Sequence, residues 1–171
     1  MSNAARAVLL ASLFVPTSAL ADAEYLARFD GAFRGTGSVQ REQDTSPRRV
    51  NCSVEGSQPS ANRLRIAGVC RAAVIVRREI GADIRFDPAS GQFSGSYTGS
   101  TKGVSRLSNG RLRGDTLTFT LTYPVTVHGD RTATMAIRNS GNGTFALTVT
   151  DDVDGTPRRT SDIMLRRGSR G

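Results

Sequence analysis

Apolar and polar residues alternate singly along most of the chain from residue 29 onward, a pattern typical of β-strands with one buried and one solvated face. The clearest run is 115–123, in which leucine, phenylalanine and tyrosine alternate with four threonines. Similar alternation recurs at 29–39, 82–87, 93–97, 131–138, 144–151 and 161–166. The pattern predicts an all-β protein.

Clusters of turn-forming residues separate these runs, and the connections between neighbouring runs are short. The clearest clusters are 128–130, 139–143 and 154–157, each of which contains glycine. Strands joined in this way form consecutive hairpins, and a meander of about nine or ten twisted strands curls until its edges meet. We therefore predict one domain over residues 22–171, an antiparallel up-and-down β-barrel of the lipocalin type. A two-sheet β-sandwich is the alternative architecture.

Three segments follow the pattern less cleanly. Residues 72–80 combine a Val-Ile-Val centre, which favours a strand, with flanking residues that would allow a helical turn; we predict a strand. The Ser-Asn-Gly sequence at 108–110 predicts a turn. After the N-terminal segment, a helical period of 3.6 residues is compatible only with 23–28.

The first 21 residues have the order of a secretory signal peptide. Arg6 precedes an apolar run at 7–15, a proline-containing break follows, and residues 19–21 form an Ala-Leu-Ala cleavage box. The apolar run is far shorter than the roughly 20 residues that a membrane-spanning helix needs. We predict cleavage after Ala21 and delivery to the periplasm or the exterior, with no transmembrane segment. An uncleaved N-terminal helix or anchor is the alternative.

The chain has two cysteines, and exported proteins enter compartments that oxidise thiols. Cys52 lies in a strand predicted over 49–55. Cys70 lies in the next strand, predicted over 63–71. The turn-forming residues between them predict a hairpin centred near Ala61, which would place the cysteines opposite each other. We predict a structural disulfide; the alternative, a reactive thiol pair, lacks the Cys-x-x-Cys spacing of redox proteins.

The composition excludes several kinds of catalytic site. One histidine and two cysteines are too few for a zinc site built from these ligands, and His128 alone cannot supply catalysis by several histidines. No Gly-x-Ser-x-Gly motif marks a serine nucleophile. Asp151, Asp152 and Asp154 resemble a calcium loop, yet position 161 is serine where an EF-hand requires glutamate. We therefore predict a solvated acidic turn, with weak metal binding as the alternative, and we expect no enzymatic activity or cofactor.

Arginine is the residue whose use departs most from the average, and the chain has a formal charge of +8. Neighbouring residues of a strand face opposite sides, so each arginine doublet contributes at most one side chain to a face. Aligned strands would form a patch for anionic lipid, lipopolysaccharide or an envelope protein; a solvated arginine-rich surface is the alternative. We exclude nucleic acid as a partner, because no stacking set of aromatic residues accompanies the arginines. The candidate anion-binding residues are Arg48, Arg49, Arg77, Arg78, Arg158 and Arg159.

The stretch 110–152 has a repeated hairpin cadence: G-R-L-R-G-D-T-L-T-F-T-L-T-Y-P, then H-G-D-R-T-A-T-M-A-I, then G-N-G-T-F-A-L-T-V-T-D. Together with the N-terminal segment and the cysteine pair, it resembles small exported proteins of alphaproteobacteria that have no assigned activity. The cadence covers 43 of the 171 residues. The resemblance implies a lipocalin-like barrel and implies no particular ligand.

These observations favour a non-enzymatic periplasmic binding or cell-envelope module. Its ligand, anionic or amphipathic, would lie at the barrel mouth or on an arginine-bearing face. The alternative is a protein-directed module, such as a protease inhibitor or an assembly accessory, whose N-terminal arm at 23–29 enters a partner's cleft. An enzyme would need a cleft in which His128 meets a carboxylate of perturbed pKa.

Overall fold

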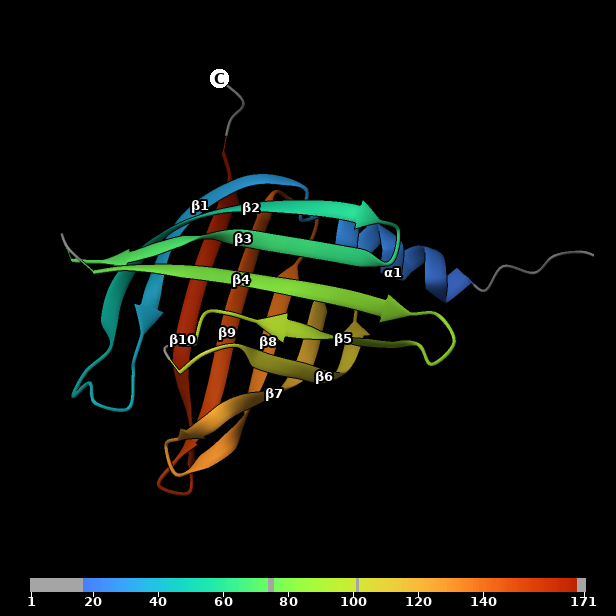
Figure 1. The fold of residues 1–171 in the computed structure, drawn as a ribbon. Helices are drawn as coiled ribbons and strands as arrows, with labels where there is room; N and C mark the ends of the chain where they lie inside the picture. The colour runs from blue at the N-terminus through green and yellow to red at the C-terminus, as the bar shows by residue number, and fades with distance from the viewer. Residues whose placement is uncertain (1–16, 74–75, 101, 169–171) are drawn as a thin grey trace, which may run out of the picture.

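The computed structural model describes residues 17–73, 76–100 and 102–168, and over these residues ten strands form a closed antiparallel barrel (Figure 1). Each strand pairs with its neighbours in the sequence, and the first strand also pairs with the last. This confirms the predicted all-β, up-and-down barrel and excludes the two-sheet sandwich. The elements are α1 (Thr17–Ala27), β1 (Gly31–Val39), β2 (Arg48–Ser60), β3 (Arg63–Ala72), β4 (Val76–Asp87), β5 (Gln92–Tyr97), β6 (Ser105–Arg113), β7 (Thr116–Val127), β8 (Asp130–Asn139), β9 (Thr144–Val153) and β10 (Thr156–Arg167).

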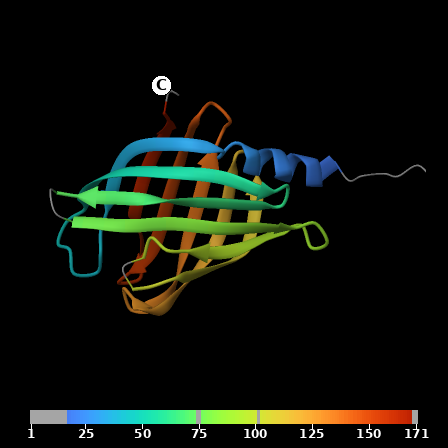
Figure 2. The same cartoon turned by 45° about the horizontal axis from the view of Figure 1, so that its top comes forward.

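The barrel wall has two sides, on which β2–β4 run across the direction of β8–β10 (Figures 1 and 2). Alternate side chains of every strand enter the space between them and form the core. Along β7, Leu117, Phe119, Leu121 and Tyr123 are buried, as the alternation predicted. Pleated strands place every second side chain on the same face, so a period of two in the sequence becomes the inner lining of the barrel.

Helix α1 and the turn between it and β1 close one end of the barrel. Tyr25, Leu26 and Phe29 are each at most 1% exposed. The ring of Phe29 meets the rings of Tyr25 and Phe145 edge-on, at centroid distances of 5.3 and 5.2 Å. The hydroxyl of Tyr25 donates a hydrogen bond to the carbonyl oxygen of Ile137 at 2.7 Å. This segment therefore acts as a plug, with Tyr25, Leu26 and Phe29 in the core and the buried Tyr25 hydroxyl paired.

Close approach between strands explains one of the glycines. Gly35 of β1 lies opposite Cys52 of β2 on one side and Leu165 of β10 on the other. A Cβ atom at this position would overlap the carbonyl oxygen of Met164. Glycine thus allows the two strands to approach where β1 bends around the barrel, as small barrels require.

The structure differs from the sequence predictions in three segments. The strand predicted over 72–80 is divided, because β3 ends at Ala72 and β4 begins at Val76, and these two residues pair with each other. The turn predicted at 108–110 is a bulge inside β6: Asn109 takes a φ of 54°, and the strand continues beyond the irregularity. Helix α1 begins at Thr17, earlier than the turn expected at 23–28.

The predicted signal peptide lies only partly within the described residues. Its apolar run at 7–15 lies outside them, and the predicted cleavage site after Ala21 falls within α1. Cleavage there would leave Tyr25, Leu26 and Phe29 attached to the barrel. Helix α1 has 11 residues, and no helix in the described part of the chain is long and apolar enough to cross a membrane.

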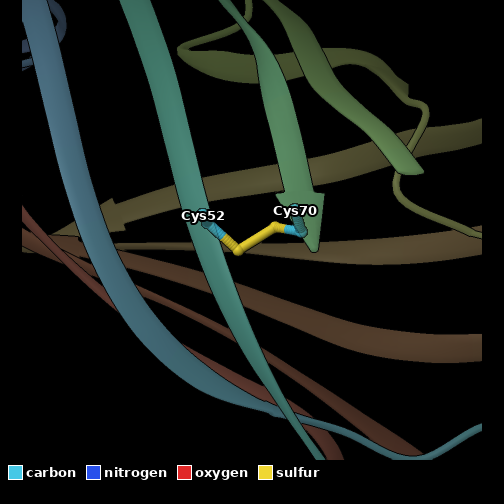
Figure 3. The surroundings of a disulfide bond; sticks show 2 residues. All are labelled: Cys52 and Cys70. Atoms are coloured by element: carbon cyan, nitrogen blue, oxygen red, sulfur yellow. A yellow bond between two sulfur atoms is a disulfide. The ribbon is translucent and has the colours of Figure 1, made fainter. Parts of the chain in front are cut away.

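Strands β2 and β3 form the predicted hairpin, and Cys52 pairs directly with Cys70 across it (Figure 3). The two Cα atoms are 4.0 Å apart, and the sulfur atoms form a disulfide. Both side chains face the barrel interior, where they are 4% and 7% exposed. The predicted pairing is confirmed, and the bond is part of the core.

Candidate functional site

The end of the barrel opposite α1 contains a cavity of about 170 Å³, which we call the mouth recess. The connections from β1 to β2, β3 to β4, β5 to β6, β7 to β8 and β9 to β10 lie at this end. Apolar side chains from the inner faces of the strands make up much of its wall. They include Val39, Val50, Ile80, Val127, Val149 and Ile163. An apolar recess of this kind suits a ligand that buries a ring or a short chain.

A carboxylate lies in the wall of this recess. Asp151 is 3% exposed and continues the inward face of β9. The Tyr123 hydroxyl donates a hydrogen bond to its Oδ1 atom at 2.9 Å, and the Thr160 hydroxyl donates to its Oδ2 atom. Burial, together with the neighbouring Asp151 charge, raises the pKa of Tyr123, so this hydroxyl remains a donor. The predicted solvated acidic turn is therefore wrong for Asp151, whereas Asp152 and Asp154 are exposed.

Two further hydroxyl groups lie beside this arrangement. Tyr97 of β5 lines the recess, and burial raises its pKa to about 12. Ser105 of β6 pairs with Tyr97, and the register between β6 and β7 places it beside Tyr123. The Oγ atom of Ser105 is buried without a hydrogen-bond partner in the described part of the chain. Buried polar groups are nearly always hydrogen-bonded, so we expect a partner from outside the chain.

The polar cluster at the mouth does not have the composition of a metal centre. Within residues 17–73, 76–100 and 102–168, no group of three histidine, cysteine or acidic side chains could hold a metal ion. Hydroxyl groups surround the carboxylate instead, and they are hydrogen-bond donors as well as acceptors. The cluster suits recognition of a polar organic group.

The six candidate arginines lie at the same end of the barrel, because β2, β4 and β10 all begin there. Because side chains alternate between the two faces of a strand, one arginine of each doublet lies on the same face as the inward-facing residues, which we call the inward phase. The inward-phase residues are Arg48, Arg78 and Arg158, and the outward-phase residues are Arg49, Arg77 and Arg159. All six are exposed, and only Arg48 and Arg78 among them line the mouth recess. A role of the six in anion binding stays a prediction.

The loop at 40–47, between β1 and β2, is organised around the buried carboxylate of Asp44. Arg41 Nη2 donates to Asp44 Oδ1 at 2.7 Å, and Arg48 Nε donates to the same oxygen at 2.8 Å. The Asp44 side chain is 1% exposed. These bonds, those from Arg41 first, hold the pKa of Asp44 well below its usual range. Arg41 of the loop and Arg48 at the start of β2 therefore both lie at the mouth, and Asp44 offsets one of their two charges.

The same loop is connected across the mouth through Glu42. Its carboxylate accepts a hydrogen bond from the backbone N–H of His128 at 3.1 Å. It also forms an ion pair with Lys102, at 3.4 Å between Oε2 and Nζ. These contacts link the β1–β2 loop to the β7–β8 turn and to the β5–β6 connection. His128 itself lines the mouth recess and makes this contact through its backbone.

Asp44→Asn is expected to lower the free energy of unfolding at neutral pH by about 1–2 kcal/mol, since charged hydrogen bonds are weakened. The pKa of Asp44 in the folded protein lies below its ordinary value of 3.8, so the carboxylate stabilises the fold above that pH. This contribution is lost as the pH falls toward the lowered folded value. The difference between wild type and variant should therefore shrink below about pH 4.

Urea unfolding at neutral and acidic pH measures this difference. Thr45→Ala, at an exposed neighbouring position, is the control and should show no such pH dependence. A stability difference between wild type and Asp44→Asn that stays constant from neutral pH to pH 3 would contradict the expectation.

The arm proposed from the sequence for capture of a partner is part of the barrel. Tyr25, Leu26 and Phe29 belong to the arm at 23–29, and all three are buried in the core. These side chains would have to leave the barrel before the arm could enter another protein's cleft. The geometry thus favours the mouth recess over the arm as the functional site.

No protein-family model and no curated protein matches this sequence. Among solved structures, the chain is similar to the crystal structure of Rv2717c from M. tuberculosis, with a TM-score of 0.61 and 12% identity, over 91% of this chain and 99% of that chain. It also matches the structure of EF1p2_mFAP2b bound to DFHBI, with a TM-score of 0.41 and 14% identity, over 86% and 99% of the two chains. At this identity the first likeness shows a shared barrel fold and no shared activity. Neither match bears on the alphaproteobacterial origin that the cadence suggested.

Proposed function

We propose that this protein is a non-enzymatic binding module of the periplasm or cell envelope, which holds a small amphipathic ligand with an acidic group in the mouth recess. The apolar wall of the recess supports burial of the ligand's apolar part. The Cys52–Cys70 disulfide fits an oxidising compartment. The acidic group would bind at the arginine-bearing rim.

The observation that carries this proposal is the position of Arg78. It has the inward phase of β4, lines the recess and is exposed to solvent there. It forms no ion pair with any acidic side chain in the part of the chain that the structure describes. A guanidinium group binds a carboxylate through two parallel hydrogen bonds, so this arginine is available for an acid. Arg48, the other rim arginine of the six, is already bound to Asp44.

The volume of the recess limits the part of the ligand that it can bury. A cavity of about 150 Å³ in a protein core is large enough for benzene. The mouth recess, at about 170 Å³, is therefore large enough for one ring or a short alkyl chain. The acidic group remains at the rim, where it keeps part of its hydration.

Chemical-shift titration by NMR with 3-phenylpropionate and hexanoate tests this proposal. We expect both acids to shift resonances of Val50, Val149 and Ile163. Arg78→Gln should weaken their binding about three- to tenfold, which is the range of a partly exposed charged hydrogen bond. Arg77→Gln is the matched control, because it removes the same charge from the outward-phase neighbour. Equal weakening by both variants, or no binding of either acid, would contradict the proposal.

A further inference from the structure

Asp151 is a buried carboxylate without a cationic partner in the part of the chain that the structure describes. No lysine, arginine or histidine nitrogen lies within 4.0 Å of it. Arg158 pairs with it across β9 and β10, yet the arginine is exposed and forms no ion pair with it. Taking a carboxylate out of water is costly unless an opposite charge or several hydrogen bonds compensate for it.

The hydrogen bonds that Asp151 receives leave part of its capacity unused. Tyr123 and Thr160 donate one hydrogen bond each, whereas an ionised carboxylate offers about four acceptor positions. Ser105, beside Tyr123, has a buried hydroxyl without a partner. A donor group that entered the recess would find unused acceptor positions on Asp151, which lines it.

The strand order places the Asp151 carboxylate across the recess from Arg78. In the ring of ten strands, β9 and β4 are separated by five steps in either direction. Asp151 on β9 and Arg78 on β4 therefore lie on opposite walls, and both line the recess. The apolar side chains of Val50, Val149 and Ile163 line the same recess. The recess thus has a positive side, a negative side and an apolar interior.

From this arrangement we infer that the ligand is a zwitterion, whose protonated amine binds Asp151 while its acidic group binds Arg78. The inference rests on the proposed function, because it names the ligand class for the same recess. The class is a small ω-amino acid, because its short alkyl chain separates the amine from the acidic group, as binding to opposite walls requires. No group within the described chain supplies the cation that Asp151 lacks, and a ligand amine would supply it.

The experiment compares each acid with the compound that differs from it by an amine. The pairs are 3-phenylpropionate with phenylalanine, and hexanoate with 6-aminohexanoate, each titrated into the full exported protein by NMR. In the second pair 6-aminohexanoate should bind about tenfold tighter than hexanoate, which corresponds to one close charge pair of about 1.4 kcal/mol. Phenylalanine, whose amine and acidic group share one carbon, should gain less over 3-phenylpropionate. Asp151→Asn should abolish that difference between the zwitterion and the acid. Asp152→Asn is the matched control, because it removes a carboxylate from the exposed neighbour and should preserve the difference.

The outcomes separate this inference from the proposed function. If the acids bind and the amine adds no affinity, or if the added affinity survives in Asp151→Asn, the inference fails and the proposed function stands. If neither acids nor zwitterions bind, the proposed function itself fails. Phenethylamine and hexylamine complete the set: an amine that binds as tightly as its zwitterion would overturn the inference, because the acidic group would then contribute nothing. Should Asp151→Asn not fold, the ¹³C carboxyl resonance of Asp151 in the wild type must shift with the zwitterion and not with the acid.

Discussion

Phe29→Ala is expected to lower the free energy of unfolding by about 3–5 kcal/mol, the range for removal of a buried phenylalanine side chain. Phe29 is 1% exposed and contacts the rings of Tyr25 and Phe145. Its removal would leave a cavity between the helix and the barrel, and the plug would lose the ring that joins it to β9. Urea unfolding followed by circular dichroism measures the change.

Ala27→Ser, at an exposed position of the same helix, serves as the control for Phe29→Ala. It should change the free energy of unfolding by less than about 1 kcal/mol. A comparably small loss in Phe29→Ala would show that α1 contributes little to the barrel in solution.

Replacement of both Cys52 and Cys70 by alanine is expected to lower the free energy of unfolding by about 3 kcal/mol. The two residues are 18 positions apart, so the bond closes a loop whose entropy in the unfolded chain accounts for this value. The comparison is urea unfolding of the oxidised wild type and of the double variant at neutral pH.

Reduction provides the second arm of this experiment. A reducing agent should destabilise the wild type by a similar amount and leave the double variant unchanged. Because both cysteines are buried, we also expect reduction of the wild type to be slow until the protein unfolds. Two titratable thiols in the denatured, unreduced protein would contradict the disulfide.

Most of the barrel could be predicted from the sequence, because each strand of an antiparallel barrel has one face toward the core and one toward water. In β7 and β9 this difference appears as strict alternation, and their inward residues were identified correctly. The boundary between two strands within 72–80 was not predicted, because the apolar pattern continues from Ala72 to Val76 although the chain changes direction between them. The bulge at Asn109 was mistaken for a turn, because Ser-Asn-Gly favours positive φ in either setting.

The candidate site depends on information that is less local. The period of two that places Phe145 and Val149 inside the barrel also places Asp151 inside, and this signal was present in the sequence. Its acidic neighbours favoured a solvated turn instead. The meeting of Arg48 and Arg78 at one recess follows from strand direction and ring order, which no single segment contains.

The pairing of β1 with β10 has a consequence for the order of events during biosynthesis. The wall of the cylinder cannot be completed until the last strand, which ends at Arg167, has been synthesised. The β2–β3 hairpin and its sulfur bridge involve only nearby residues, so they can form while the rest of the polypeptide is still being delivered. The covalently linked hairpin would then keep its apolar face exposed until β10 pairs with β1 and closes the barrel.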